Sequence, residues 1–310
     1  YADDTAFGGK VGCCRTFFLE IMEVILADVL GYCMGVRRAM EKVISALNNR
    51  TCNNLLKSNV YSLGPLIHNQ FVLDMLTKEG LCVLKEDEIE KISENSTVVI
   101  RAHGIPPYTL KKLKIRNCII VDATCPRVLA NQKTVSKYAS LGYTIIFAGD
   151  KNHGEVTAIA GYAGDNFILL ENINDALKLK GSIQTNKNAI LLSQTTFSPS
   201  VFNDIAKVLS SCFSNLKIIN TICPATKERQ CALLNLCPKV DGILVVGGKD
   251  SANTQRLFQI AKENCKNTAF IETADEIPES FFYLEKVGIT AGASTPDDII
   301  FSVQKKLKSF

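Results

Sequence analysis

Three cysteines, each lying between a strand-like run and a helix-like run, constrain this chain of 310 residues more than any other feature. Cys33, Cys125 and Cys223 each follow a short apolar run and precede a stretch that carries Arg or Lys. Pro126 and Pro224 directly follow two of them, and proline is favoured at the first position of a helix. Each of the three cysteines is therefore predicted to lie on a strand-to-helix turn.

The spacing of these cysteines predicts a repeated unit. They are separated by 92 residues (33 to 125) and by 98 residues (125 to 223), and four strand-like runs recur in each third of the chain. This period is too long for a solenoid repeat. The sequence therefore predicts an α/β protein of three similar lobes with mostly parallel sheets, in a pseudo-threefold arrangement.

Polar residues follow three of the four strand-like runs in each third. Open α/β sheets bind ligands at the carboxyl ends of their strands, and right-handed crossovers bring the strand ends of one lobe to a single edge. Three lobes that face inward would bring the cysteines to one central point. The polar residues at the predicted strand ends are Cys33, His68 and His103, then Cys125, His153 and 193–196, then Cys223, 251–253 and Ser294.

Three thiolates from distant parts of a chain can hold two kinds of metal centre. No C-x-x-C pair is present in the sequence, although structural zinc sites often use such pairs. A cubane iron–sulfur cluster with one iron left free fits three thiolates, and a free iron is a Lewis acid. A zinc site of three cysteines and one histidine fits the same spacing, so the cysteines alone leave both alternatives open.

Eight short segments, in order along the chain, closely resemble the 4-hydroxy-3-methylbut-2-enyl diphosphate reductase family, also called IspH or LytB. The resemblance runs from about Met22 to the C-terminus, and eight segments in register are highly specific. The segments are Gly31–Ala39, Gly64–Asn69, Arg101–Ile105, Val121–Pro126, His153–Glu155, Ser193–Thr196, Thr221–Cys223 and Ala291–Pro296.

The resemblance implies a cofactor and a role for each site residue. It implies one 4Fe–4S cluster at the centre of the three lobes, with the fourth iron open to substrate. Glu155 matches the proton-delivering carboxylate, and Thr195 matches the threonine that contacts the substrate hydroxyl. One departure is Ala252, where the family commonly has a second serine. The cluster ligands implied are Cys33, Cys125 and Cys223, and the diphosphate-binding residues implied are His68, His103, His153, Ser251, Asn253 and Ser294, with His153 also in the catalytic pocket.

The reaction implied is a reductive dehydroxylation. An allylic hydroxyl leaves as water, two electrons and two protons are added, and the products are isopentenyl and dimethylallyl diphosphate, in the last step of the non-mevalonate (methylerythritol phosphate) pathway. The resemblance also implies a transient electron donor such as ferredoxin or flavodoxin. Two rival classes are a non-enzymatic metal sensor, which needs no diphosphate pocket, and a metal hydrolase, which favours His and carboxylate ligands over thiolates.

Charge, hydropathy and the domain boundaries complete the expectations. The formal net charge of +4 is mild and predicts no nucleic-acid partner. The apolar stretch 17–30 contains three acidic residues, so no membrane partner is expected, and unpaired cysteines favour a cytoplasmic location. We expect residues 1–21 to be an extension without counterpart in the family. The resemblance implies that residues 22–34 add a first strand to the third lobe, and lobes 1, 2 and 3 are expected at 35–125, 126–220 and 221–310.

Overall fold

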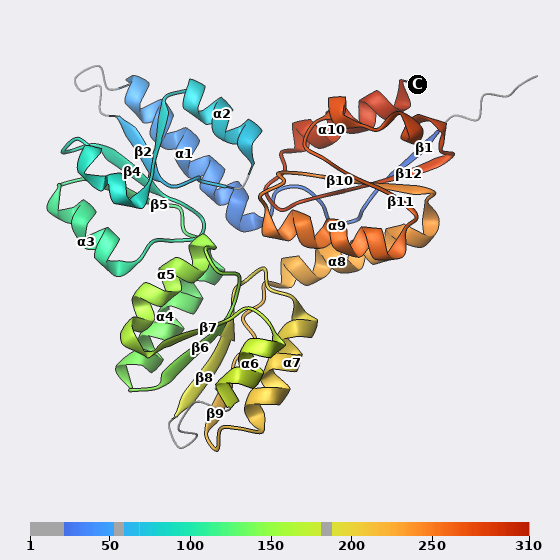
Figure 1. Ribbon diagram of the computed structural model, residues 1–310. Helices are drawn as coiled ribbons and strands as arrows, with labels where there is room; N and C mark the ends of the chain where they lie inside the picture. The colour runs from blue at the N-terminus through green and yellow to red at the C-terminus, as the bar shows by residue number, and fades with distance from the viewer. Residues whose placement is uncertain (1–21, 53–58, 68, 181–187, 310) are drawn as a thin grey trace, which may run out of the picture.

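Three parallel sheets build this molecule. The computed structural model describes residues 22–52, 59–67, 69–180 and 188–309. The described strands form three four-stranded sheets, and every strand pairing in them is parallel. Figure 1 shows the three resulting lobes around a common centre. The three-lobed α/β architecture expected from the sequence is therefore confirmed.

Lobe 1 is built on a sheet with the strand order β3-β2-β4-β5. Helix α1 packs against β2, β4 and β5, although it precedes all of them in the chain. The strands are β2 Val60–Leu63, β3 Leu81–Leu84, β4 Thr97–Ile100 and β5 Ile119–Asp122, and the α-helices are α1 Met34–Cys52, α2 Gln70–Lys78 and α3 Pro107–Ile115.

Lobe 2 repeats the same order with β7-β6-β8-β9. Its strands are β6 Thr144–Ala148, β7 Phe167–Leu170, β8 Ala189–Ser193 and β9 Leu216–Ile218, and its α-helices are α4 Pro126–Ser140, α5 Gly154–Ala163, α6 Ile173–Lys180 and α7 Pro199–Ser210.

Lobe 3 has the equivalent order β11-β10-β12-β1, but its edge strand comes from the start of the described chain. Val24 of β1 pairs with Val287 of β12. The chain therefore leaves lobe 3 after β1 and enters lobe 1 through α1. The strands are β1 Glu23–Leu26, β10 Gly242–Val246, β11 Asn267–Ile271 and β12 Lys286–Ala291, and the α-helices are α8 Pro224–Leu236, α9 Ala252–Asn264 and α10 Asp297–Lys308.

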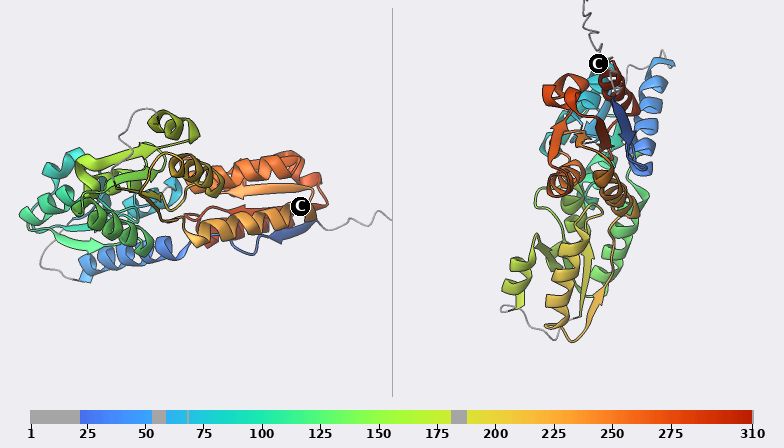
Figure 2. Two further views of the ribbon diagram at one scale, coloured as in Figure 1. Left: turned by 90° about the horizontal axis from the view of Figure 1, so that it is seen from below. Right: turned by 90° about the vertical axis from the view of Figure 1, so that its right-hand side faces the viewer.

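Each sheet is covered on both faces, which explains why its central strands are mostly apolar. Every residue of β8 and of β10 is buried, as expected for parallel strands between two helical layers. Each lobe contains two separate apolar clusters, one on each side of its sheet. The side views in Figure 2 show a flat body in which the three lobes lie in roughly one plane.

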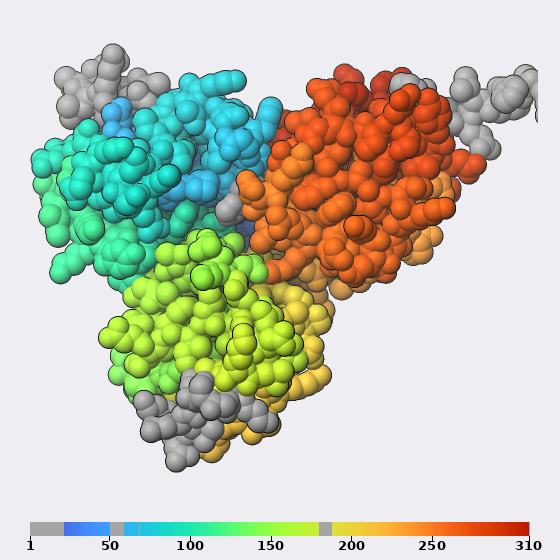
Figure 3. Space-filling view, in the orientation of Figure 1, coloured from blue at the N-terminus to red at the C-terminus, as the bar shows by residue number. Residues whose placement is uncertain are grey.

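The lobes meet at the centre of this flat body and diverge toward its perimeter (Figure 3). Lobe 3 is fastened to lobe 2 by an ion pair, in which Arg256 of α9 donates to both carboxylate oxygens of Asp150 at 2.9 and 3.0 Å. The guanidinium also lies over the ring of Phe197. Within the described ranges, no helix is long and apolar enough to cross a membrane.

Candidate functional site

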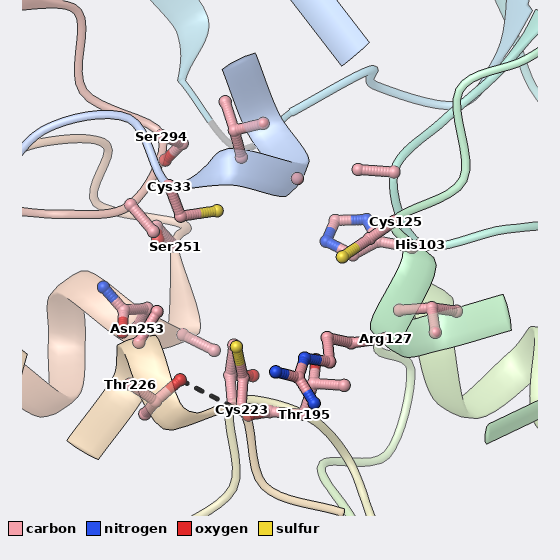
Figure 4. A pocket seen from close by; sticks show the side chains of 18 of the residues that line it. Cys33, His103, Cys125, Arg127, Thr195, Cys223, Thr226, Ser251, Asn253 and Ser294 are labelled. Atoms are coloured by element: carbon pink, nitrogen blue, oxygen red, sulfur yellow. Dashed lines mark hydrogen bonds between the residues drawn. The ribbon is translucent and has the colours of Figure 1, made fainter. Parts of the chain in front are cut away.

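A cavity at the centre of the molecule, here called the central cavity, is lined by residues of all three lobes (Figure 4). Most of the residues singled out in the sequence line it. Glu155 is instead fully buried behind the cavity wall. His68 lies outside the described residues. The predicted residues that line the central cavity are Cys33, His103, Cys125, His153, Thr195, Cys223, Ser251, Asn253 and Ser294.

The three cysteines occupy equivalent positions at the starts of helices. Cys125 and Cys223 are the N-cap residues of α4 and α8, each followed by proline, and Cys33 directly precedes α1. The positive end of a helix dipole favours a thiolate at such a position. Burial raises the pKa of the Cys125 thiol, and backbone N–H groups at the start of α4 partly offset that effect.

Backbone hydrogen bonds give the three cysteines the same support. Each cysteine N–H donates to a carbonyl in the loop that follows a central strand, and the next residue of that loop lines the central cavity. Thr196 is thus the counterpart in lobe 2 of His103 and Ser294, a role that its sequence position did not indicate. The hydrogen-bonded pairs are Cys33 with Ala293 (3.1 Å), Cys125 with Ala102 (2.9 Å) and Cys223 with Thr195 (2.7 Å).

The side chains of the three cysteines face a common space in the central cavity. The three sulfur atoms face the same opening from three directions (Figure 4). Among the described residues, no three His, Cys, Asp or Glu side chains are grouped to hold a single ion. Gly35 leaves room beside Cys125, because a Cβ at Gly35 would lie 2.7 Å from the sulfur. Three thiols that face one opening could together hold a metal-containing group.

Glu155 and Thr195 form a buried pair behind the cavity wall. The Thr195 hydroxyl donates to Glu155 Oε2 at 2.6 Å, and the Thr195 N–H lies 3.1 Å from each carboxylate oxygen. Asn131 of α4 donates to Glu155 Oε1 at 3.3 Å. Thr195 is 8% exposed and lines the central cavity, whereas Glu155 is 0% exposed. The hydroxyl of Thr195 therefore separates the carboxyl group from the cavity.

Burial raises the pKa of Glu155 to about 7, although the hydrogen bonds from Thr195 and Asn131 act in the opposite direction. The protein produces the shift without any bound anion, because the carboxyl group is removed from water. A pKa near neutrality suits a group that gives up a proton at ordinary pH.

This shift predicts a pH-dependent loss of stability. The unfolded chain releases the Glu155 proton near pH 4.5, but the folded chain retains it up to about pH 7. Stability therefore falls as pH rises through this window, by roughly 3 kcal/mol at 1.36 kcal/mol per pKa unit. Glu155→Gln should not show this loss. Urea denaturation of the wild type and of Glu155→Gln at pH 4.5 and 7.5 measures this loss. If the two proteins differed in free energy of unfolding by the same amount at both pH values, the prediction would be contradicted.

Two imidazoles from neighbouring lobes meet at the cavity. The rings of His103 and His153 lie edge to face, with centroids 4.8 Å apart. His153 is the N-cap of α5, and its Nδ1 accepts the N–H of Glu155 at 3.2 Å. Nδ1 therefore carries no proton, and the proton of a neutral ring must lie on Nε2. His153 can thus donate from Nε2 to a ligand.

Lobe 3 contributes donors suited to an anion. Ser251 is the N-cap of α9, whose N-terminus supplies a partial positive charge. Asn253 is 6% exposed, and its Nδ2 is buried without a hydrogen-bond partner in the described part of the chain. A buried donor left unpaired costs about 1–3 kcal/mol. An acceptor group of a ligand at this position would remove that cost.

Three site residues escaped the sequence reasoning. Asn131 supports Glu155 from behind, and Arg127 and Arg229 line the central cavity. Both arginines fall in the basic stretches that follow the cysteines, where they read as ordinary helical residues. The signal that could have identified the two arginines is their position, within two helical turns of a cysteine at the start of a helix.

Known proteins resemble this chain over almost its whole length. A family model described as LytB protein matches residues 24–308. A relative from Treponema denticola is 44% identical over 290 residues, covering 92% of this chain and 99% of the relative. A relative from Caldanaerobacter subterraneus is 40% identical, covering 93% of this chain and 97% of the relative. Both are named 4-hydroxy-3-methylbut-2-enyl diphosphate reductase.

Solved structures agree with the sequence comparisons. The E-1-hydroxy-2-methyl-but-2-enyl-4-diphosphate reductase from Plasmodium falciparum superposes with a TM-score of 0.82 at 30% identity, covering 92% of this chain and 86% of that one. A structure of (E)-4-hydroxy-3-methyl-but-2-enyl diphosphate reductase, described as the terminal enzyme of the non-mevalonate pathway, gives 0.68 at 34% identity, covering 93% and 100%. These matches confirm the resemblance seen in the sequence, and the chain belongs to the LytB family.

Proposed function

We propose that this chain is a 4-hydroxy-3-methylbut-2-enyl diphosphate reductase that removes the allylic hydroxyl of its substrate as water. Two electrons and two protons are consumed, and isopentenyl and dimethylallyl diphosphate are formed. The observation that carries the proposal is the convergence of Cys33, Cys125 and Cys223 on one cavity. The same cavity has anion donors on one side and the Glu155–Thr195 pair on another.

The three cysteines would hold a 4Fe–4S cluster. When bound, such a cluster supplies electrons and an iron without a protein ligand that can act as a Lewis acid toward the substrate oxygen. The helix N-termini at the cysteines stabilise thiolates, and the missing side chain of Gly35 leaves room at Cys125. These features support the cluster proposal from the protein side.

The diphosphate of the substrate would bind to the imidazoles and to the donors of lobe 3. His103, His153, Ser251, Asn253 and Ser294 line the central cavity, and hydroxyl, amide and imidazole N–H groups are effective donors to anionic oxygens. His68 is assigned to the same role through the family resemblance. This placement orients the substrate, with its allylic end toward the cysteines.

Glu155 would deliver protons through Thr195. Thr195 donates its hydroxyl hydrogen to Glu155 Oε2, so its oxygen can contact the hydroxyl of the substrate from the cavity side. When Glu155 is protonated, its O–H can donate to the Thr195 oxygen, and the Thr195 hydroxyl hydrogen can then turn toward the leaving oxygen. Transfer of both protons along this line would protonate the leaving oxygen without exposing the carboxyl group. The raised pKa keeps Glu155 protonated up to about pH 7.

Two further assignments come from the sequence and not from the geometry of the site. A small ferredoxin or flavodoxin would supply the electrons, and the reaction would take place in the cytoplasm. Neither assignment is needed to explain the site. The identity of the electron donor is tested separately from the chemistry, because a chemical reductant can replace the natural donor in an assay.

The proposal is tested by anaerobic incubation of the iron-loaded protein with 4-hydroxy-3-methylbut-2-enyl diphosphate and dithionite. We expect the allylic alcohol to disappear and the two isoprenyl diphosphates to form, as measured by anion-exchange chromatography. A metal hydrolase would instead release inorganic diphosphate and a free diol. Formation of those products, or no turnover by protein that carries the cluster, would contradict the proposal.

Truncation of the His103 side chain should weaken the binding of substrate and product without an equal fall in the rate of the chemical step. His103→Ala removes a diphosphate contact, and the diphosphate is unchanged along the reaction, so substrate and product affinities should fall together. We expect roughly a tenfold rise in both dissociation constants, equal to about 1.4 kcal/mol. Isothermal calorimetry measures both. Weaker substrate binding with normal product binding would show that His103 contacts the allylic end.

A further inference from the structure

Arg229 is a charged residue buried in the wall of the central cavity. It lies on α8, the helix that begins after Cys223, and it is 3% exposed. Its Nη1 atom is buried without a hydrogen-bond partner in the described part of the chain. Thr226, three residues earlier, also lines the cavity, as expected for side chains on one helix face.

A guanidinium in this position is expensive unless a negative charge lies nearby. Arginine stays protonated in proteins, and burying an uncompensated charge costs several kcal/mol. Burial lowers the pKa of Arg229, and the charges that oppose this effect come first from Cys33 and Cys223 in their ionised form and only then from Glu228. Ionised as metal ligands, these two cysteines would supply the main compensating charge.

The other arginine of the cavity differs in exposure. Arg127 lines the cavity but is exposed to solvent, so water and salt screen its charge. The charge of Arg229 acts in a buried environment, where electrostatic effects are several times stronger than in water. Of the two arginines, Arg229 is therefore the one whose charge acts more strongly on a group bound between the cysteines.

We propose that Arg229 is the fixed positive charge that balances the thiolates of Cys33 and Cys223 and thereby raises the reduction potential of the cluster. This inference rests on the proposed function. Reduction adds a negative charge to the cluster, and a nearby buried cation stabilises the reduced form more than the oxidised form. Charge and hydrogen bonding around the sulfurs are known determinants of iron–sulfur potentials. Arg229 therefore acts through its positive charge and does not itself react with the substrate.

The test is the midpoint reduction potential of the cluster, measured by redox titration followed by electron paramagnetic resonance. Arg229→Gln removes the charge, and Arg229→Lys keeps it. Lys227→Gln is the matched control, because it removes the same charge from an exposed position on the same helix. We expect a clear shift to lower potential in Arg229→Gln only, with Arg229→Lys and Lys227→Gln close to the wild type.

Each result has a definite meaning. If Arg229→Gln fails to hold a cluster while Arg229→Lys holds one at the wild-type potential, the charge role is supported. A wild-type potential in Arg229→Gln overturns the inference, and so does the same loss or shift in both Arg229 variants. A wild-type protein without any iron–sulfur cluster overturns the proposed function instead, so the two failures are distinguishable.

Discussion

Replacing Cys223 by serine should remove most of the bound iron and abolish turnover. The Cys223 sulfur is one of three that face the central cavity, from the N-terminus of α8. A serine hydroxyl is a poor ligand for iron, because it is not ionised near neutral pH, and two remaining thiolates cannot retain the cluster against air or chelators. Cys33→Ser and Cys125→Ser should behave in the same way. Iron and sulfide analysis after anaerobic purification measures the loss.

The matched control for this experiment lies on the same helix. Cys231 of α8 is exposed and does not line the central cavity, so Cys231→Ser should keep the iron. The other cysteines away from the cavity, such as Cys82 and Cys265, should also tolerate serine. A protein bleached by Cys231→Ser but not by Cys223→Ser would refute the assignment of the three ligands.

Glu155→Gln should separate binding from chemistry. Glutamine keeps the shape of the side chain and can accept the Thr195 hydrogen bonds, but it cannot act as an acid. We expect the variant to retain the cluster and to bind substrate almost normally, while kcat falls by about 10²-fold or more. Anaerobic turnover with a chemical reductant measures this effect without any contribution from donor docking.

The pH profile adds a second readout for Glu155. Because the acid form is required and burial raises the pKa to about 7, wild-type kcat should decline as pH rises above 7. The slow residual rate of Glu155→Gln should lack that decline. Glu171→Gln is the control, since Glu171 is an exposed carboxylate of the same lobe. Wild-type turnover in Glu155→Gln would assign the proton donor elsewhere, with His153 or the diphosphate of the substrate as the next candidates.

The architecture could be predicted from the sequence because local sequence patterns that indicate strands and turns repeat along the chain. Strand-like runs and cysteines at turns are visible without coordinates and recur three times, and proline follows two of the three cysteines, Cys125 and Cys223. The assignment of the first strand to lobe 3 came from the family resemblance. No local pattern around Glu23 indicates that β1 pairs with β12, more than 250 residues away, because strand pairing across a chain leaves no signature in one strand.

The chemistry of the site was less accessible, since it depends on burial. A carboxyl group at Glu155 was evident, but its enclosure behind Thr195 arises from the packing of α4, α5 and β8, which the sequence does not display. Arg229 was hidden for the same reason. Only the orientation of α8 determines that Arg229 is buried beside the cysteines while its neighbour Glu228 is exposed.

In the proposed site, three cysteines at the starts of three helices hold one iron–sulfur cluster in the central cavity. Anaerobic analysis of metal and acid-labile sulfide, together with the visible spectrum, tests it most directly. We expect about four iron and about four sulfide per chain, with the broad visible absorption of a thiolate-bound cluster. About one zinc per chain, with no labile sulfide and no visible absorption, would contradict it.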